Sequence, residues 1–99
     1  MHELMKKAAT FCAARNWPQN PKDVAVGVSV EAGELLKHFE WKTEAQAWQH
    51  LKDKKEAVAD EMADVLFCLL ILADVGNVDL VEAFEKKMQK NAQKYPLQT

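Results

Sequence analysis

Two stretches of the chain, VSVEAGELLKHF (residues 28–39) and VADEMADVLFCLLILA (residues 58–73), decide its fold and point to its chemistry. Their apolar residues recur at spacings of three and four, which is the pattern of an amphipathic helix that buries one face. Each stretch also carries two carboxylates, three residues apart, in or beside that apolar stripe: Glu31 and Glu34, and Glu61 and Asp64. A three-residue spacing puts both side chains of a pair on one helix face.

A carboxylate on an apolar helix face loses its hydrating water when the helix packs, and another interaction must replace that hydration. Removing its charge from water costs several kcal/mol unless the group is neutralised, paired or bound to a metal. Glu31 shares its stripe with Val28 and Leu35, and Glu61 falls in the stripe of Val58. Two matching acid pairs on two helices therefore predict a cation site between them.

The ligand chemistry favours Mg²⁺ over iron. Mg²⁺ prefers oxygen ligands and combines a few carboxylates with waters and substrate phosphates. A di-iron bundle needs Glu-x-x-His on two helices. The nearest match is Glu34-x-x-x-His38, which is one residue too long, and nothing equivalent follows Glu61. The alternative is a set of ordinary surface ion pairs between these acids and the nearby lysines, namely Lys37, Lys54 and Lys55.

The rest of the chain predicts an all-α bundle of four main helices and one short helix. Only three Gly and three Pro occur in 99 residues, and no run alternates like a strand. Asn20 with Pro21 is a helix-start signal, and Gly76 is a helix-end signal. The main helices are expected over residues 3–16, 20–41, 53–75 and 79–95, with a short helix opened by a capping box at residues 43–46 and a second capping box at residues 79–82.

Composition restricts the class of protein. A chain of 99 residues that is 48% hydrophobic makes one domain over residues 1–99, and so short a domain gains from assembly with other copies. The net charge of −2 gives no case for nucleic acid or an anionic membrane as partner. The longest apolar run, residues 65–73, is far shorter than the roughly 18 residues of a membrane span, and the start lacks an apolar signal core. We expect a cytoplasmic protein, with Cys12 and Cys68 as reduced thiols.

Three motifs occur along the chain: EAGELLKHFEW (residues 31–41), DEMADVLFCLLILADVGNVDL (residues 60–80) and KKMQKNAQKYP (residues 86–96). In this order they resemble the MazG-like all-α nucleoside triphosphate pyrophosphohydrolases, and within them the small dCTP pyrophosphatase branch. The resemblance covers about residues 11–96. It implies Mg²⁺-dependent hydrolysis of a nucleoside triphosphate to the monophosphate and pyrophosphate, with Mn²⁺ as a substitute cation. It also implies house-cleaning of the nucleotide pool by a homodimer or homotetramer (a dimer of dimers), with dCTP as the first substrate to test.

The resemblance also assigns roles to residues. Mg²⁺ would be held by the four acids of the two pairs: Glu31, Glu34, Glu61 and Asp64. Glu34 and Glu61 are the catalytic candidates, and Glu34 is preferred as the carboxylate that accepts the proton of the attacking water.

The remaining assignments concern the substrate. The resemblance implies that Trp17 and Trp41 stack on the base and that the last helix contacts phosphates or sugar through Lys87, Asn91 and Lys94; Tyr95 is a further candidate for a substrate contact. The alternatives are a solvated charged face for the lysines, packing of the helix end for Tyr95, and ordinary core or interface positions for the two Trp. His38 is expected to make an interior polar contact rather than to bind a ligand.

The chain departs from the branch at Cys68 and in a shorter loop between Trp17 and the second helix. Cys68 stands where the branch tends to have Tyr near the base, which leaves base preference open. A helical interaction module that has lost turnover is the alternative from another class. A pyrophosphohydrolase acting on other phosphoanhydrides, such as phosphoribosyl-ATP, is the third.

Overall fold

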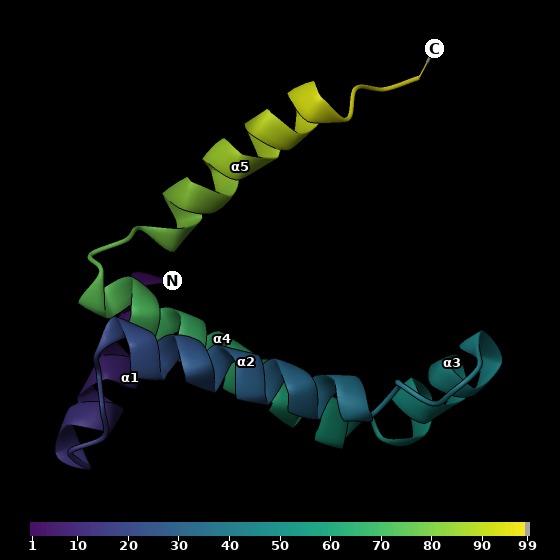
Figure 1. Cartoon of the computed structure of the whole chain (residues 1–99), viewed down its shortest axis with the longest axis horizontal. Coiled ribbons are helices and arrows are strands. Elements are labelled where there is room, and N and C mark those ends of the chain that lie inside the picture. Colours follow the sequence, from purple (N-terminus) through teal and green to yellow (C-terminus); the bar gives the residue numbers. More distant parts are fainter. Residues whose placement is uncertain (99) are drawn as a thin grey trace.

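The computed structural model describes residues 1–98 and consists of five α-helices (Figure 1). These are α1 (His2–Ala14), α2 (Pro21–Lys37), α3 (Glu44–Asp53), α4 (Lys55–Val75) and α5 (Leu80–Lys94). The predicted all-α class and the predicted number of helices are confirmed.

The longest helix, α4, organises the molecule. It lies beside α2 along most of its length, meets α1 near one end and touches α3 near the other (Figure 1). The main hydrophobic core forms where α1, α2 and the second half of α4 meet. Its buried members are Ala8, Cys12, Val24, Leu70 and Ile71.

Local capping signals set the helix starts as predicted. The Asn20 side chain accepts a hydrogen bond from the Asp23 backbone N–H at 2.9 Å, and Pro21 occupies the first helical position of α2. At α3, the Thr43 hydroxyl and the Gln46 side chain form the reciprocal capping box. These short-range bonds satisfy backbone groups that a helix start leaves without partners.

The end of α2 differs from the prediction. The helix stops at Lys37 rather than near Trp41, because the next N–H groups form tighter bonds. The His38 N–H bonds to the Leu35 carbonyl and the Phe39 N–H to the Leu36 carbonyl, each only three residues back. This tightening turns the chain toward α3.

The turn between α4 and α5 also differs in detail. Gly76 does follow the last residue of α4, but its φ of −91° is not left-handed. Asn77 takes the left-handed conformation instead, with φ 52°. Asn adopts this region more readily than other non-glycine residues because its short side chain can hydrogen-bond locally. Asp79 then caps α5 by accepting from the Glu82 N–H at 3.0 Å. Only this half of the predicted capping box is formed, because the Glu82 carboxylate pairs with Lys86.

The prediction of a compact bundle is wrong for the single chain. The Cα radius of gyration is 16.4 Å, whereas a compact chain of this length has about 13 Å. Helix α5 points away from the other helices and makes little contact with them (Figure 1). The physical reason is that the apolar face of α5 finds no partner surface within the chain.

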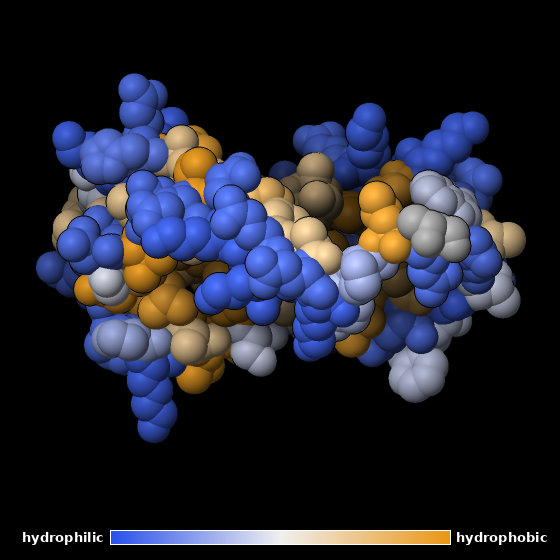
Figure 2. Space-filling view, turned by 90° about the horizontal axis from the view of Figure 1, so that it is seen from above, coloured by the Kyte–Doolittle hydropathy of each residue, from blue (hydrophilic) through white to orange (hydrophobic). Residues whose placement is uncertain are grey.

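Much apolar surface is therefore exposed. Figure 2 shows hydrophobic residues at the surface among hydrophilic ones. Side chains that would be interior in a closed bundle are accessible, with 60% of Phe84, 57% of Met62 and 53% of Val30 exposed. Within residues 1–98, no helix combines the length and apolar character that crossing a membrane requires.

Candidate metal centre and substrate site

Three of the four predicted acids converge at the seam between α2 and α4. Glu31 comes from α2, while Glu61 and Asp64 lie one turn apart on α4. Each offers a carboxylate oxygen, and these oxygens all lie within 4.8 Å of one another. The predicted one-face spacing thus produces a real cluster, which we call the acid cluster.

The acid cluster is electrostatically uncompensated by protein cations. Glu31 and Glu61 are half-buried and Asp64 is exposed. Burial raises the pKa of the Glu31 carboxyl, and the neighbouring charges of Asp64, Glu61 and Glu34 raise it further. Among the described residues, neither Lys nor Arg forms an ion pair with these three acids.

One atom of the acid cluster is left without a partner. Glu61 Oε2 is enclosed by protein and has no hydrogen-bond partner within residues 1–98. Such an oxygen normally carries a substantial cost unless a donor or a cation satisfies it. With this oxygen, the carboxylates of Glu31 and Asp64 supply the hard oxygen ligands that Mg²⁺ prefers, so the residues present fit a divalent cation.

Glu34 behaves differently from the other three acids. Its Oε1 pairs with Lys37 Nζ at 3.1 Å, and 44% of its side chain is exposed. The surface ion pair considered as an alternative therefore exists for this residue. Glu34 is still close enough for its charge to raise the pKa of Glu31. Its role as metal ligand or base stays a prediction.

The two helices approach closely one turn beyond the acid cluster. A Cβ added at Gly27 on α2 would lie 3.3 Å from the Cys68 Sγ on α4. Burial raises the pKa of the Cys68 thiol, and the Glu31 and Asp64 carboxylates raise it further. Gly27 and Cys68 are therefore two small residues at a close approach of α2 and α4, one turn from the acid cluster.

The two tryptophans predicted to meet the base are accessible. Trp17, between α1 and α2, is 49% exposed and packs edge-on against Phe11 with ring centroids 5.5 Å apart. Trp41, in the turn after α2, is 90% exposed. A core position is thus excluded for Trp41 within the single chain, and an interface or ligand position remains for both.

The substrate residues predicted on the last helix are not brought to the acid cluster within one chain. Lys87, Asn91 and Lys94 all lie on α5, which leaves the α1, α2 and α4 assembly, and Tyr95 follows it (Figure 1). Lys94 Nζ lies 5.4 Å from the centre of the Tyr95 ring. The expected single site is therefore split between two parts of the chain, because α5 is not folded back.

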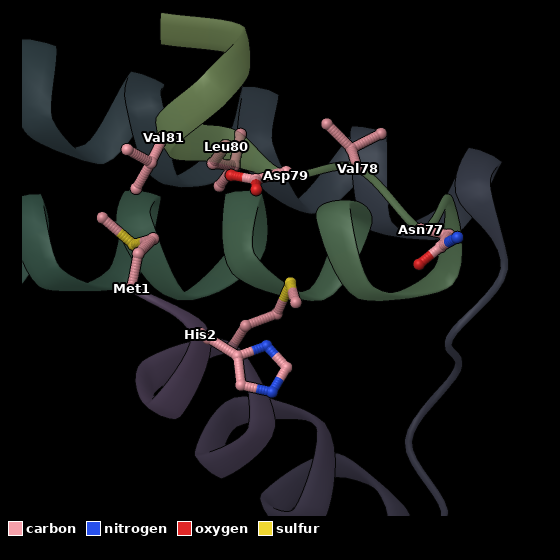
Figure 3. Close-up of a pocket in the computed structure, with 8 residues that line it drawn as sticks. Met1, His2, Asn77, Val78, Asp79, Leu80 and Val81 are labelled. Atoms are coloured by element: carbon pink, nitrogen blue, oxygen red, sulfur yellow. The ribbon is translucent and has the colours of Figure 1, made fainter. Parts of the chain in front are cut away.

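A separate cavity of about 540 Å³ lies where α1 begins and α4 turns into α5 (Figure 3). Met1, the residue before α1, and His2, the first residue of α1, line one side of the cavity, and the segment 77–81 lines the other. None of the predicted site residues lines this cavity, so it is distinct from the acid cluster.

The predicted interior contact of His38 is made with a residue that sequence reasoning did not single out. Its Nδ1 lies 2.8 Å from Nε2 of His50 on α3. No local pattern links these residues, which are twelve positions apart and meet only when α3 folds back.

Comparison with known proteins agrees with the motifs. The chain is 36% identical over 103 residues to dCTP pyrophosphatase 1 of Rattus norvegicus, covering 98% of the chain and 59% of that protein. It is 33% identical over 102 residues to dCTP pyrophosphatase 1 of Homo sapiens, covering 97% of the chain and 59% of that protein. The chain thus spans about three-fifths of the length of these curated relatives.

A solved structure and a family match extend the comparison. The crystal structure of a pyrophosphatase from Archaeoglobus fulgidus DSM 4304 superimposes with a TM-score of 0.91 at 39% identity, covering 98% of this chain and 93% of that one. Residues 26–99 match the MazG-like family. These matches confirm the family expected from the three motifs: the chain belongs to the MazG-like family.

Proposed function

We propose that this protein hydrolyses nucleoside triphosphates to the monophosphate and pyrophosphate, using Mg²⁺ held by the acid cluster. Its relatives in Rattus norvegicus and Homo sapiens are named dCTP pyrophosphatase 1, so dCTP is the first substrate to test. Clearing surplus or modified nucleotides from the cytoplasmic pool is the matching cellular role.

The observation that carries the proposal is the convergence of Glu31, Glu61 and Asp64 within 4.8 Å, with one enclosed oxygen unpartnered. A divalent cation bound there would offset charge on the phosphates and lower the pKa of a water that it holds. The protein's part is to present oxygen ligands from two helices whose packing fixes their spacing. A helical interaction module has no need for such a cluster.

A carboxylate must also accept the proton of the attacking water. Glu34 is suited to this task because it lies one turn from Glu31 on α2 and is only partly buried. Its partner Lys37 is exposed, so the Glu34–Lys37 pair costs little to open. In this scheme Glu31, Glu61 and Asp64 would hold the cation, and Glu34 would take the proton. Glu61 is catalytic through the position it gives the cation.

Substrate binding requires surfaces that one chain does not bring together. The exposed rings of Trp17 and Trp41 offer faces for stacking on a base, which is worth about 1–3 kcal/mol in nucleic-acid complexes. Lys87 and Lys94 on α5 would neutralise phosphate charge. We infer that the active form is a homodimer or homotetramer, in which α5 of one copy completes the site of another.

The exposed apolar face of α5 supports this assembly. Val81, Phe84 and Met88 repeat at spacings of three and four and are 52%, 60% and 41% exposed. That spacing is the seam pattern of a helix that packs against another helix. A second copy offers apolar surface of its own, because Leu36, Met62 and Leu66 are also exposed.

Product analysis tests the proposal directly. The purified protein is incubated with each common NTP and dNTP, with and without Mg²⁺, and products are separated by anion-exchange chromatography. The expected result is Mg²⁺-dependent release of pyrophosphate and monophosphate in one step. Release of inorganic phosphate and a nucleoside diphosphate would contradict it, and folded but inactive protein would favour the interaction module.

Matched variants separate the roles of the acids. Glu31→Gln and Asp64→Asn should abolish most turnover with the helical fold retained. Glu56→Gln, an exposed acid in the first turn of α4, should leave activity unchanged. Activity at the wild-type level in all three variants would show that the acid cluster is not the catalytic site.

A further inference from the structure

Two histidines tie the end of α2 to α3, outside the acid cluster. His38 follows the last residue of α2, and His50 lies in the last turn of α3. Their Nδ1 and Nε2 atoms are 2.8 Å apart, and both side chains are half-buried. The Phe39 ring packs edge-on against His50 with centroids 5.7 Å apart, which encloses one side of the pair.

This bond limits how many protons the pair can hold. One nitrogen must donate its hydrogen and the other must offer a lone pair, which only a neutral imidazole has. The bond therefore tolerates at most one extra proton shared between the two rings. A second proton removes the acceptor and places two positive charges in contact.

The surrounding charges make protonation at this place more costly. Burial lowers the pKa of His50, and Lys42, His38 and Lys54 lower it further, while Asp53 acts in the opposite direction. Lys42 lies in the turn after α2, and Lys54 joins α3 to α4. The two lysines also disfavour a metal cation as the occupant of this histidine pair.

Helix α3 makes few packing contacts with the other helices. It has ten residues, none of them buried, and its one substantial helix contact is with α4. A helix this short is marginal in water on its own. The bond between His38 and His50 adds a side-chain link from the end of α2 to α3, whose helix contact is with α4.

We propose that the His38–His50 pair is a pH-sensitive latch, which holds α3 against α2 near neutral pH and releases it as the pH falls. The direction of the pH effect follows from the number of protons that the closed and the open pair bind. The closed pair binds fewer protons than the open pair, so the free energy of opening falls as pH drops below the ordinary histidine value of about 6.5. Above that value the latch is fully closed. The proposal does not depend on any catalytic activity.

Hydrogen exchange of the α3 backbone amides tests the latch in the full-length protein. Rates are measured between about pH 7.5 and pH 5.5 and corrected for intrinsic exchange. Opening that takes up one proton should make exchange of α3 amides faster by up to about tenfold per pH unit, whereas amides in the α2–α4 core should change little. A corrected α3 rate that is independent of pH would overturn the proposal.

The chain offers a matched control, since its third histidine, His2, is exposed on α1. His50→Gln and His38→Gln should each abolish the pH dependence of α3 exchange, and His2→Gln should retain it. Retention of the dependence in either latch variant would also overturn the proposal. If those variants fail to fold, an NMR titration of wild type decides: the second proton taken up by the His38–His50 pair must bind below about pH 6.5, and binding at or above that pH contradicts the latch.

Discussion

At Glu61, a carboxylate oxygen enclosed by protein has no hydrogen-bond partner within residues 1–98. The nearby carboxylates of Glu31 and Asp64 make its surroundings more negative rather than less. In the absence of a cation, the folded chain carries this repulsion and the unfolded chain does not. The acid cluster should therefore reduce stability until a metal binds.

Replacing Glu61 by Gln tests this cost. The substitution removes one charge and keeps the shape, so Glu61→Gln should melt higher than wild type in EDTA, by roughly 4 °C or more per kcal/mol of repulsion relieved. Mg²⁺ should raise the wild-type melting temperature, because saturation at about 100 times Kd stabilises a native state by about 2.7 kcal/mol. The variant should respond much less.

Thermal melts of both proteins at one concentration, with and without Mg²⁺, supply the measurement. Glu56→Gln is the control, since it removes an exposed acid from the same helix. A wild type that is the more stable protein in EDTA and indifferent to Mg²⁺ would show that the acid cluster is not a metal site.

Trp17 and Trp41 carry a second prediction at the residue scale. Stacking contributes mainly uniform binding, so Trp17→Ala and Trp41→Ala should raise KM more than they lower kcat. Loss of the stacking contact between one tryptophan ring and the base should raise KM about fivefold or more. Steady-state kinetics on several bases measure this, with Trp48→Ala, an exposed residue of α3, as the control. Unchanged KM values would assign both residues to packing.

The contact between helices α2 and α4 determines the spacing of the acid cluster. Gly27 and Cys68 let these helices approach closely one turn away from it, since an added Cβ at Gly27 would lie 3.3 Å from Sγ. Gly33, further along α2, has no atom within 4 Å of where a Cβ would lie. The two glycines thus share a helix and differ in what faces them.

This difference predicts that replacing glycine by alanine changes the stability of the protein differently at the two positions. Alanine is better than glycine in a helix interior by about 1 kcal/mol, so Gly33→Ala should raise the melting temperature by about 4–8 °C. Gly27→Ala should gain less or lose stability, because the added methyl presses on Cys68. A double-mutant cycle with Cys68→Ala should give a coupling of about 0.5 kcal/mol or more. A loss of stability in Gly33→Ala would instead show that another surface packs on this part of α2.

For the whole molecule, the radius of gyration of 16.4 Å and the detached α5 are the observations on which the proposed assembly with other copies rests. Phe84→Asp places a charge in the apolar stripe of α5, so it should shift the protein to monomer and reduce activity. Gln89→Asp adds the same charge elsewhere on α5 and is the control. Sedimentation velocity measures the change, and an unaltered oligomer would show that α5 is not the interface.

Mixing two inactive variants tests whether α5 crosses between copies. Glu61→Gln lacks a competent acid cluster, and the Lys87→Ala/Lys94→Ala double variant lacks phosphate contacts. After exchange of subunits in an equal mixture, about half of the dimers are mixed and each has one intact site of two, so the mixture should regain about one quarter of wild-type activity. No recovery despite proven exchange would place α5 over the acids of its own chain.

The features that the sequence alone determined are those with local causes. Helix periodicity, the Asn20 cap and the Thr43–Gln46 capping box depend on residues a few positions apart, and all three are present. The three family motifs could likewise be recognised from the sequence alone. The pairing of acids on helix faces followed from the 3.6-residue turn, which placed Glu61 and Asp64 together without knowledge of the fold.

The tertiary structure decided what depends on contacts between distant residues. It selected Glu31, Glu61 and Asp64 for the acid cluster and left Glu34 with Lys37. It also brought His38 to His50. The separation of α5 from the acid cluster could not be predicted, because an apolar stripe specifies that a helix must pack but not against which chain.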